Sequence, residues 1–290
     1  MRTLEALLKT GTNCLRKSGI EEAALDAWLL LEFVTGKNRA YFLAHPDEET
    51  EEALCIQYEA LIEKRSQRIP LQHLTHQAYF MGLAFYVNED VLIPRQDTEV
   101  LAEEALKFLK AKENPRILDM CTGSGCILLS ILSGRQDASG VGVDISAAAL
   151  DVAKKNAHRL MVQKRAEFVE SDIFCGSFFG QKDGKTQEKY DMLISNPPYI
   201  ATGELGDLMD EVRLYDPHLA LDGKEDGLFF YREITRQAGT YLKQGGMLAY
   251  EIGCSQGRDV LELMEAAGFE EVKVIKDLAG LDRVVTGLWK

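Results

Sequence analysis

Short apolar runs typical of buried strands alternate with stretches of helical period along the chain from residue 116 onward. A helix that follows each strand carries the chain back across the sheet, so that the next strand lies parallel to the last. The pattern therefore predicts an α/β fold with a doubly wound, mainly parallel sheet. The predicted strands are 116–120, 141–145, 166–170, 190–195, 246–252, 272–275 and 283–288, with helices at 127–132, 147–160, 227–242 and 256–267.

The chain before this region has a different period. Apolar residues recur at helical spacing over 4–33 and 54–62, with breaks at Thr35-Gly36 and Ile69-Pro70. The period then becomes that of strands over 79–93, around the turn signal at residues 88–90. We therefore expect three parts. These are a helical domain over 1–72, a connecting β-hairpin over 73–94 and a catalytic domain over 95–290.

Composition and charge restrict the partners and the compartment. The formal net charge of -13 disfavours stable binding to a phosphate backbone. The sequence starts with Met-Arg-Thr and an amphipathic pattern, so we expect no cationic-apolar leader, and it shows no apolar run long enough to cross a bilayer. None of the six cysteines is paired at zinc-site spacing, so no metal is expected. We expect a cytoplasmic protein without membrane contact, in which the polar stretch 181–189 forms a loop.

A glycine turn follows the strand 116–120. Glycines at 123 and 125 allow the backbone to approach a ligand closely, and the start of the next helix favours a carboxylate. The turn differs from a dinucleotide fingerprint, because Leu128 occupies the place of a third glycine. A plain tight turn is an equal interpretation of this motif alone. The candidate ligand contacts here are Asp119, Cys121, Thr122, Gly123, Ser124 and Gly125.

Three acidic residues stand at the ends of three consecutive strands, where ligands of parallel sheets bind. Asp144 is placed to accept two ribose hydroxyls, although capping the next helix is the alternative. Asp119 could receive an ammonium group, and Asp172 lies where an adenine would sit. Such an acidic pocket suits S-adenosylmethionine, which is cationic at its sulfur and at its amino group.

The sequence Asn196-Pro197-Pro198-Tyr199 directly follows the strand 190–195. Each proline fixes its own φ and lacks an N–H, so the turn is rigid and presents carbonyl oxygens. Together with the amide oxygen of Asn196, these oxygens can accept both hydrogens of one planar NH2 group. Tyr199 offers a flat face for an amide or a base. A plain proline turn is the structural alternative.

These motifs together resemble class I methyltransferases that act on NH2 nitrogen, and more narrowly the HemK/PrmC family of release-factor glutamine methyltransferases. The segments 92–99, 212–217 and 220–228 are similar to that family as well. The resemblance implies that S-adenosylmethionine methylates the glutamine of a Gly-Gly-Gln loop in peptide-chain release factors. The chain departs from the usual residues of that family at Gln96, His76, Cys121 and Ile173.

The resemblance also assigns residues to roles. It places cofactor contacts at 121–125, at Asp144, at Ile173, which follows Asp172, and at Asn196. Asn196, Pro197 and Tyr199 are the implied catalytic residues, and Asn196, Pro197, Pro198 and Tyr199 are the implied substrate contacts. Ile173 stands where an aromatic side chain stacks on adenine in relatives, and it still offers an apolar face.

Two other functions use the same motifs. An adenine-N6 methyltransferase on DNA or RNA also needs an acceptor pair for a planar NH2, together with a basic path for phosphates and room for a flipped base. The net charge and the absence of a Lys/Arg-rich run disfavour it. A non-catalytic S-adenosylmethionine-binding protein is the third possibility, and the complete Asn196–Tyr199 turn argues against it.

Overall fold

The computed structural model describes residues 2–176, 178–179 and 188–290. Most of the predicted polar loop at 181–189 lies outside these residues. The chain forms two compact units. The first comprises the residues up to Gln77 together with Met209–Tyr215, and the second comprises Ala78–Leu208 together with Asp216–Lys290. Among the described helices, none is long and apolar enough to cross a membrane.

The first unit is a helical bundle, as the period of its apolar residues predicts. Gly36 ends the second long helix in the left-handed region (φ 68°), and its backbone N–H donates to the carbonyl of Glu32 in the last turn of that helix. A buried apolar cluster joins the long helices. The elements are β1 (Arg2–Thr3), α1 (Leu4–Lys17), α2 (Ala23–Thr35), α3 (Arg39–Ala44), β2 (Glu49–Thr50), α4 (Glu52–Ser66) and α5 (Leu71–Thr75).

A short helix from much later in the chain, α9 (Asp210–Tyr215), also belongs to the first unit. Buried Arg65 binds Asp26 Oδ2 through Nε at 2.7 Å and Glu211 Oε1 through Nη1 at 2.9 Å. Tyr215 donates from its hydroxyl to the carbonyl of Gln67. The sequence analysis predicts that this segment belongs to the catalytic domain over 95–290. Its contacts with the helical unit are polar, and polar contacts produce no periodic apolar pattern.

The second unit contains a seven-stranded sheet in the order β10-β11-β9-β8-β5-β6-β7. Neighbouring strands from β7 to β9 are parallel, and β11 and β10 are added antiparallel. The predicted α/β fold with a mainly parallel sheet is thereby confirmed. The strands are β5 (Arg116–Met120), β6 (Ser139–Asp144), β7 (Ala166–Glu170), β8 (Tyr190–Ser195), β9 (Leu242–Glu251), β10 (Phe269–Lys276) and β11 (Asp282–Trp289).

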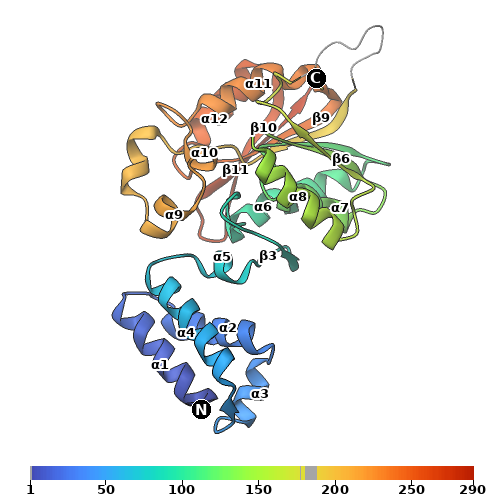
Figure 1. The fold of residues 1–290 in the computed structure, drawn as a ribbon. Helices are drawn as coiled ribbons and strands as arrows, with labels where there is room; N and C mark the ends of the chain where they lie inside the picture. The colour runs from blue at the N-terminus through green and yellow to red at the C-terminus, as the bar shows by residue number, and fades with distance from the viewer. Residues whose placement is uncertain (1, 177, 180–187) are drawn as a thin grey trace. The chain divides into compact units, whose positions relative to one another are not determined.

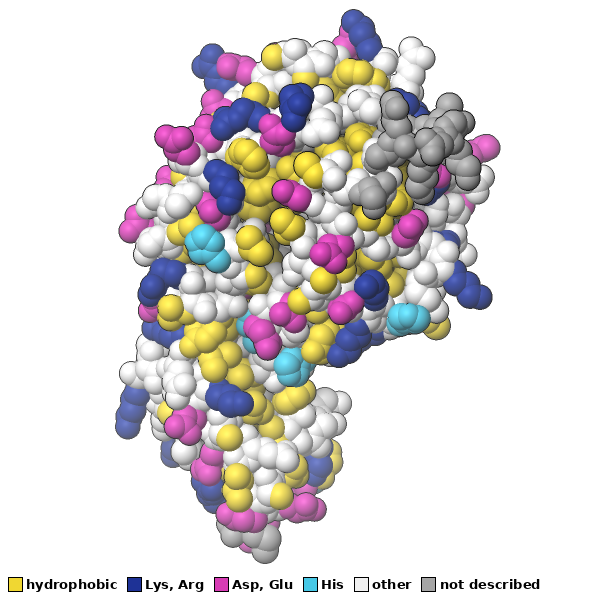
Figure 2. Space-filling view, turned by 45° about the horizontal axis from the view of Figure 1, so that its top comes forward, with side chains coloured by type: hydrophobic (Ala, Val, Ile, Leu, Met, Phe, Trp, Pro, Cys, Tyr) yellow, Lys and Arg dark blue, Asp and Glu magenta, His cyan; other side chains and the backbone are white. Residues whose placement is uncertain are grey.

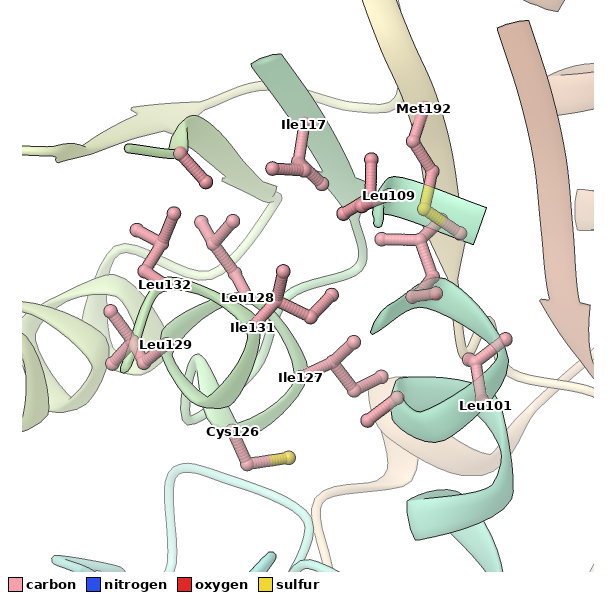
Figure 3. Close-up of a cluster of buried hydrophobic side chains, with 14 of the residues drawn as sticks. Leu101, Leu109, Ile117, Cys126, Ile127, Leu128, Leu129, Ile131, Leu132 and Met192 are labelled. Atoms are coloured by element: carbon pink, nitrogen blue, oxygen red, sulfur yellow. The ribbon is translucent and has the colours of Figure 1, made fainter. Parts of the chain in front are cut away.

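Helices cover both faces of this sheet (Figure 1). Successive strand residues point to opposite faces, so Ile117 belongs to one buried cluster and Leu118 to the other. The first cluster packs the sheet against α6 (Glu99–Leu109) and α7 (Cys126–Gly134), where Leu128 and Ile131 lie close to Ile117 (Figure 3). The remaining helices are α8 (Ala147–Arg159), α10 (His218–Leu221), α11 (Phe229–Tyr241) and α12 (Gly257–Ala266), with 3-10 turns at Gln96–Thr98 and Thr202–Asp207.

The β-hairpin lies earlier than its turn signal suggested. Strands β3 (Ala78–Phe80) and β4 (Leu83–Phe85) pair through a turn at Met81 and Gly82, both with positive φ. The segment 88–90 instead forms a local turn, in which Asn88 Oδ1 accepts from the backbone of Asp90. Asparagine and aspartate stabilise such turns without any strand pairing. The prediction of a hairpin around 88–90 was therefore wrong in its position.

Candidate active site

The glycine turn joins β5 to α7. Residues 121, 123 and 125 all have positive φ (60°, 53° and 78°). A Cβ at Gly125 would lie 2.9 Å from Leu129 Cδ1, whereas a Cβ at Gly123 would meet nothing within 4 Å. A side chain at position 125 would therefore crowd Leu129, whereas Gly123 faces open space. Cys121 adopts the left-handed conformation that glycine adopts at lower cost.

A buried asparagine that the sequence analysis missed supports this turn. Asn156 on α8 is fully buried, and its Nδ2 donates to the carbonyls of Ser124 at 2.9 Å and Tyr86 at 3.0 Å. Its Oδ1 accepts from the backbone N–H of Tyr86 at 2.7 Å. One side chain therefore joins the glycine turn, α8 and the segment after β4. Nothing in the linear pattern distinguishes it from a solvent-facing polar residue of a helix.

A cavity of about 360 Å³ lies in the second unit, beside the carboxyl ends of β5, β6, β7 and β8. Its lining combines carboxylates, two cations and apolar side chains. The sequence analysis also missed several residues that line it, among them Arg95, Ile145, Lys224, Phe229 and Phe230. The predicted residues that line it are Cys121, Thr122, Gly123, Ser124, Asp144, Asp172, Ile173, Asn196 and Pro198.

Four predicted site residues do not line this cavity. These are Asp119, Gly125, Pro197 and Tyr199. Gly125 acts through packing below the turn, as described above. Pro197 is buried and Tyr199 is partly buried, and both follow Asn196 in the same turn.

Asp144 ends β6 and accepts two backbone hydrogen bonds. Its Oδ2 accepts from Gly123 N at 2.8 Å, and its Oδ1 accepts from Ser146 N at 2.9 Å. The cap of α8 is Ser146, whose hydroxyl accepts from Ala149 N. The helix-cap alternative for Asp144 is therefore wrong. Burial raises the pKa of Asp144, and the bonds from Ser146 and Gly123 oppose that rise.

Asp119, the predicted acceptor of an ammonium group, does not line the cavity. Its side chain is completely buried and takes a 2.6 Å hydrogen bond from the hydroxyl of Thr122. Its other oxygen has no hydrogen-bond partner among the described residues. Burial raises the pKa of Asp119 to about 7. Asp119 therefore fixes the side chain of Thr122 inside the protein.

We expect Asp119→Asn to change how the stability of the protein depends on pH. A carboxyl whose pKa is higher in the folded state, about 7 against 3.8, costs stability as the pH rises above 3.8, because the unfolded form ionises while the folded form keeps its proton. That cost grows as the pH rises through the interval between these pKa values. From pH 5 to pH 8 the wild type should lose roughly 2 to 3 kcal/mol relative to the variant.

Urea unfolding of both proteins at the two pH values measures this difference. The contribution of the buried Glu251 to the pH dependence cancels, because both proteins contain this residue. An equal stability difference between the two proteins at pH 5 and pH 8 would show that the pKa of Asp119 is not raised.

The Asn196–Tyr199 turn begins where β8 ends. The hydroxyl of Ser195 donates to the carbonyl of Met120 at 2.6 Å, which fixes the end of β8 against the end of β5. The side chain of Asn196 is partly buried and lines the cavity. Among the described residues no hydrogen bond engages its amide. Asn196 and the glycine turn therefore face the same space, as the sequence predicted.

Comparison with known proteins places this site in a family. Residues 6–75 match the PrmC N-terminal domain, and residues 97–212 match the methyltransferase small domain. The release factor glutamine methyltransferase of Cereibacter sphaeroides is 42% identical, with 99% of this chain and 98% of the relative covered. That of Clostridium acetobutylicum is 38% identical, with 98% of each chain covered.

The fold has a counterpart among solved structures. A methyltransferase from Pyrococcus furiosus matches with a TM-score of 0.50 at 18% identity, over 78% of this chain and 98% of the other. At that identity the likeness concerns the fold alone. The two full-length relatives and the two matched domain models decide the assignment. The chain belongs to the HemK/PrmC family of release factor glutamine methyltransferases.

Proposed function

We propose that this protein transfers a methyl group from S-adenosylmethionine to the side-chain amide nitrogen of the glutamine in the Gly-Gly-Gln motif of peptide-chain release factors. Relatives that match over nearly the whole chain carry the name of this activity. The observation that carries the proposal is the position of Asn196, which lines the same cavity as Gly123 and Asp144.

The cavity residues fit S-adenosylmethionine. Asp144 and Asp172 supply carboxylates for the ribose and for the region of the adenine, and Ile145 and Ile173 supply apolar faces. The space at Gly123 leaves room for close approach of the cofactor. When bound, S-adenosylmethionine supplies an electrophilic methyl group on a sulfonium sulfur. Cys121 stays protonated in this role, because burial raises the pKa of its thiol.

The acceptor nitrogen requires help, because the lone pair of an amide is delocalised. Asn196 Oδ1 and the carbonyl of Pro197 would take the two hydrogens of the glutamine NH2 and favour a pyramidal nitrogen. The Pro197 carbonyl has no donor among the described residues, whereas the Tyr199 carbonyl is engaged by Gln256. Such positioning contributes about 7 kcal/mol or more in ideal cases. No strong base is needed, because the alkylated nitrogen loses its proton readily.

The helical unit is proposed as the part that recognises the release factor. A single glutamine side chain offers little binding energy, so remote contacts must place it. The match to the PrmC N-terminal domain supports this role. The release factor is a substrate in this proposal rather than a stable partner. A cytoplasmic location stays a prediction, and it agrees with the six cysteines, none of which forms a disulfide.

The surface charge bears on the nucleic-acid alternative. On the face shown in Figure 2, Lys and Arg side chains are scattered among Asp and Glu side chains rather than gathered in one patch. Binding along a phosphate backbone requires several clustered cations. The net charge of -13 acts in the same direction. These charges disfavour methylation of adenine in DNA or RNA, and the experiment below includes both nucleic acids.

A direct comparison of substrates tests the proposed function. Equal amounts of enzyme are incubated with labelled S-adenosylmethionine and with either a purified release factor, adenine-containing DNA or adenine-containing RNA. We expect label on the release factor, mapped to the target glutamine by mass spectrometry. A release factor in which that glutamine is replaced by alanine is the matched control and should take up none. Label on nucleic acid with none on the release factor would favour adenine methylation instead.

A further inference from the structure

Tyr199, the last residue of the Asn196–Tyr199 turn, is held through its backbone by one side chain. Gln256 Nε2 donates to the carbonyl of Tyr199 at 3.0 Å and to that of Gly227 at 3.3 Å. Its Oε1 accepts from Gly253 N at 3.0 Å. The amide is therefore used in both senses, and only a side chain with a donor and an acceptor can replace it.

Two glycines allow this close arrangement. A Cβ at Gly223 would lie 2.8 Å from Cα and from the carbonyl carbon of Tyr199, and a Cβ at Gly227 would collide with the Tyr199 carbonyl oxygen. The neighbouring residue Ile200 exchanges backbone bonds with 221–223 as well, since Ile200 N donates to Leu221 O and Gly223 N donates to Ile200 O. The turn thus rests on a second stretch of backbone.

The side chain of Tyr199 meets a buried carboxyl. Glu251, at the end of β9, is 98% buried, and its Oε1 lies 3.5 Å from the Tyr199 hydroxyl. Its Oε2 has no hydrogen bond of normal geometry among the described residues, although the Thr98 side chain lies near enough to lower its pKa. Burial outweighs Thr98 and the Arg283 guanidinium and raises the pKa of Glu251 to about 7.

We propose that Gln256 and Glu251 are positioning residues for methyl transfer, which hold Tyr199 from its backbone and its side chain so that the Asn196–Tyr199 turn keeps its acceptor geometry. Neither residue lines the cofactor cavity. Their effect would therefore reach the reaction through the turn, and not through the cofactor. This inference rests on the proposed function, because the geometry that they maintain is that of the glutamine site.

The hydrogen-bond pattern predicts which replacement of Gln256 is harmful. In Gln256→Glu the acceptor for Gly253 N remains, but an ionised oxygen would face the two carbonyl oxygens of Tyr199 and Gly227. A protonated carboxylic acid could again donate to Tyr199 and accept from Gly253. The defect should therefore lessen as the pH falls. Loss of volume or of general stability would show no such recovery.

The experiment compares single-turnover methyl transfer to a release factor by wild type and by Gln256→Glu, together with cofactor affinity and thermal unfolding. Gln237→Glu is the matched control, since Gln237 donates a long hydrogen bond to the carbonyl of Glu233 on the same helix, α11. We expect Gln256→Glu to slow transfer about tenfold at pH 8, with the Kd for S-adenosylmethionine within about twofold of wild type. Relative to wild type, its rate should recover as the pH is lowered to 6.

A second variant tests Glu251. Glu251→Gln keeps the size of the side chain and removes its charge, and in a cycle with Tyr199→Phe the effects on the transfer rate should be non-additive. Additive effects would remove Glu251 from the proposal. Gln256→Glu within twofold of wild type, a parallel loss of cofactor affinity, or an equal defect at both pH values would overturn the role of Gln256. Absence of transfer by the wild type would instead contradict the proposed function.

Discussion

Asn196→Ala is expected to lower the single-turnover rate of methyl transfer about 100- to 1000-fold. This range is what the loss of one preorganised polar contact to the reacting group costs in other enzymes. Asn196 lines the cavity, and its amide has no hydrogen bond among the described residues, so its removal breaks no hydrogen bond among them. The rate is measured with saturating release factor and labelled S-adenosylmethionine.

The exposed residue Asn13 on α1 provides the matched control, because Asn13→Ala makes the same chemical change away from the cavity. Thermal unfolding of both variants should stay close to that of the wild type. Some loss of cofactor affinity is compatible with the mechanism, since Asn196 is also a predicted cofactor contact. A transfer rate within a few-fold of wild type would show that Asn196 does not orient the acceptor nitrogen.

Asp144→Ala is expected to weaken the binding of S-adenosylmethionine about 10- to 150-fold. A hydrogen bond to an ionised group contributes roughly 1.5 to 3 kcal/mol, and the variant loses at least one such bond to the ribose. The same substitution removes the acceptor of Gly123 N, which loosens the glycine turn and adds to the loss. Isothermal titration calorimetry measures the effect directly.

Two comparisons sharpen this result. Asp144→Asn keeps one oxygen acceptor without the charge, and it should bind with intermediate affinity. Asp151→Ala makes the same change of net charge on the exposed side of α8, where Asp151 pairs with Lys154, and it should bind like wild type. Equal affinity of folded Asp144→Ala and wild type would mean that Asp144 serves only to brace the glycine turn.

Local pattern determined the strands and most of the helices. The predicted strands 116–120, 166–170 and 190–195 agree with β5, β7 and β8 residue for residue. Their apolar runs are bounded by charged or turn-forming residues, so both ends are marked in the sequence. The sequence also predicted that the glycine turn, Asp144 and Asn196 lie close together, because each follows or ends one of the predicted strands. In a parallel sheet, the residues that follow each strand must meet at one edge.

Contacts between distant segments were decided only by the tertiary structure. Arg65 donates a hydrogen bond to Glu211, which lies 146 residues later in the chain. The helix α9, which contains Glu211, therefore belongs to the helical unit and not to the expected catalytic domain. Asn156, Gln256 and Glu251 look like ordinary polar residues in the sequence, yet each is held by the backbone or side chain of a residue far along the chain. Periodicity reports which face of an element is apolar, and so it cannot reveal the partner of a buried polar group.

Asp119 shows the same division within a single motif. The sequence places an acid at the end of β5 and predicts that it binds the ligand, as its neighbours at the other strand ends suggest. The alternation of side chains along the strand turns Asp119 into the protein, where Thr122 occupies one oxygen. Sequence alone determined that the glycine turn and the Asn196–Tyr199 turn share one sheet edge. Which side chains face the cavity was decided by packing, because the direction of each side chain depends on its neighbours in space.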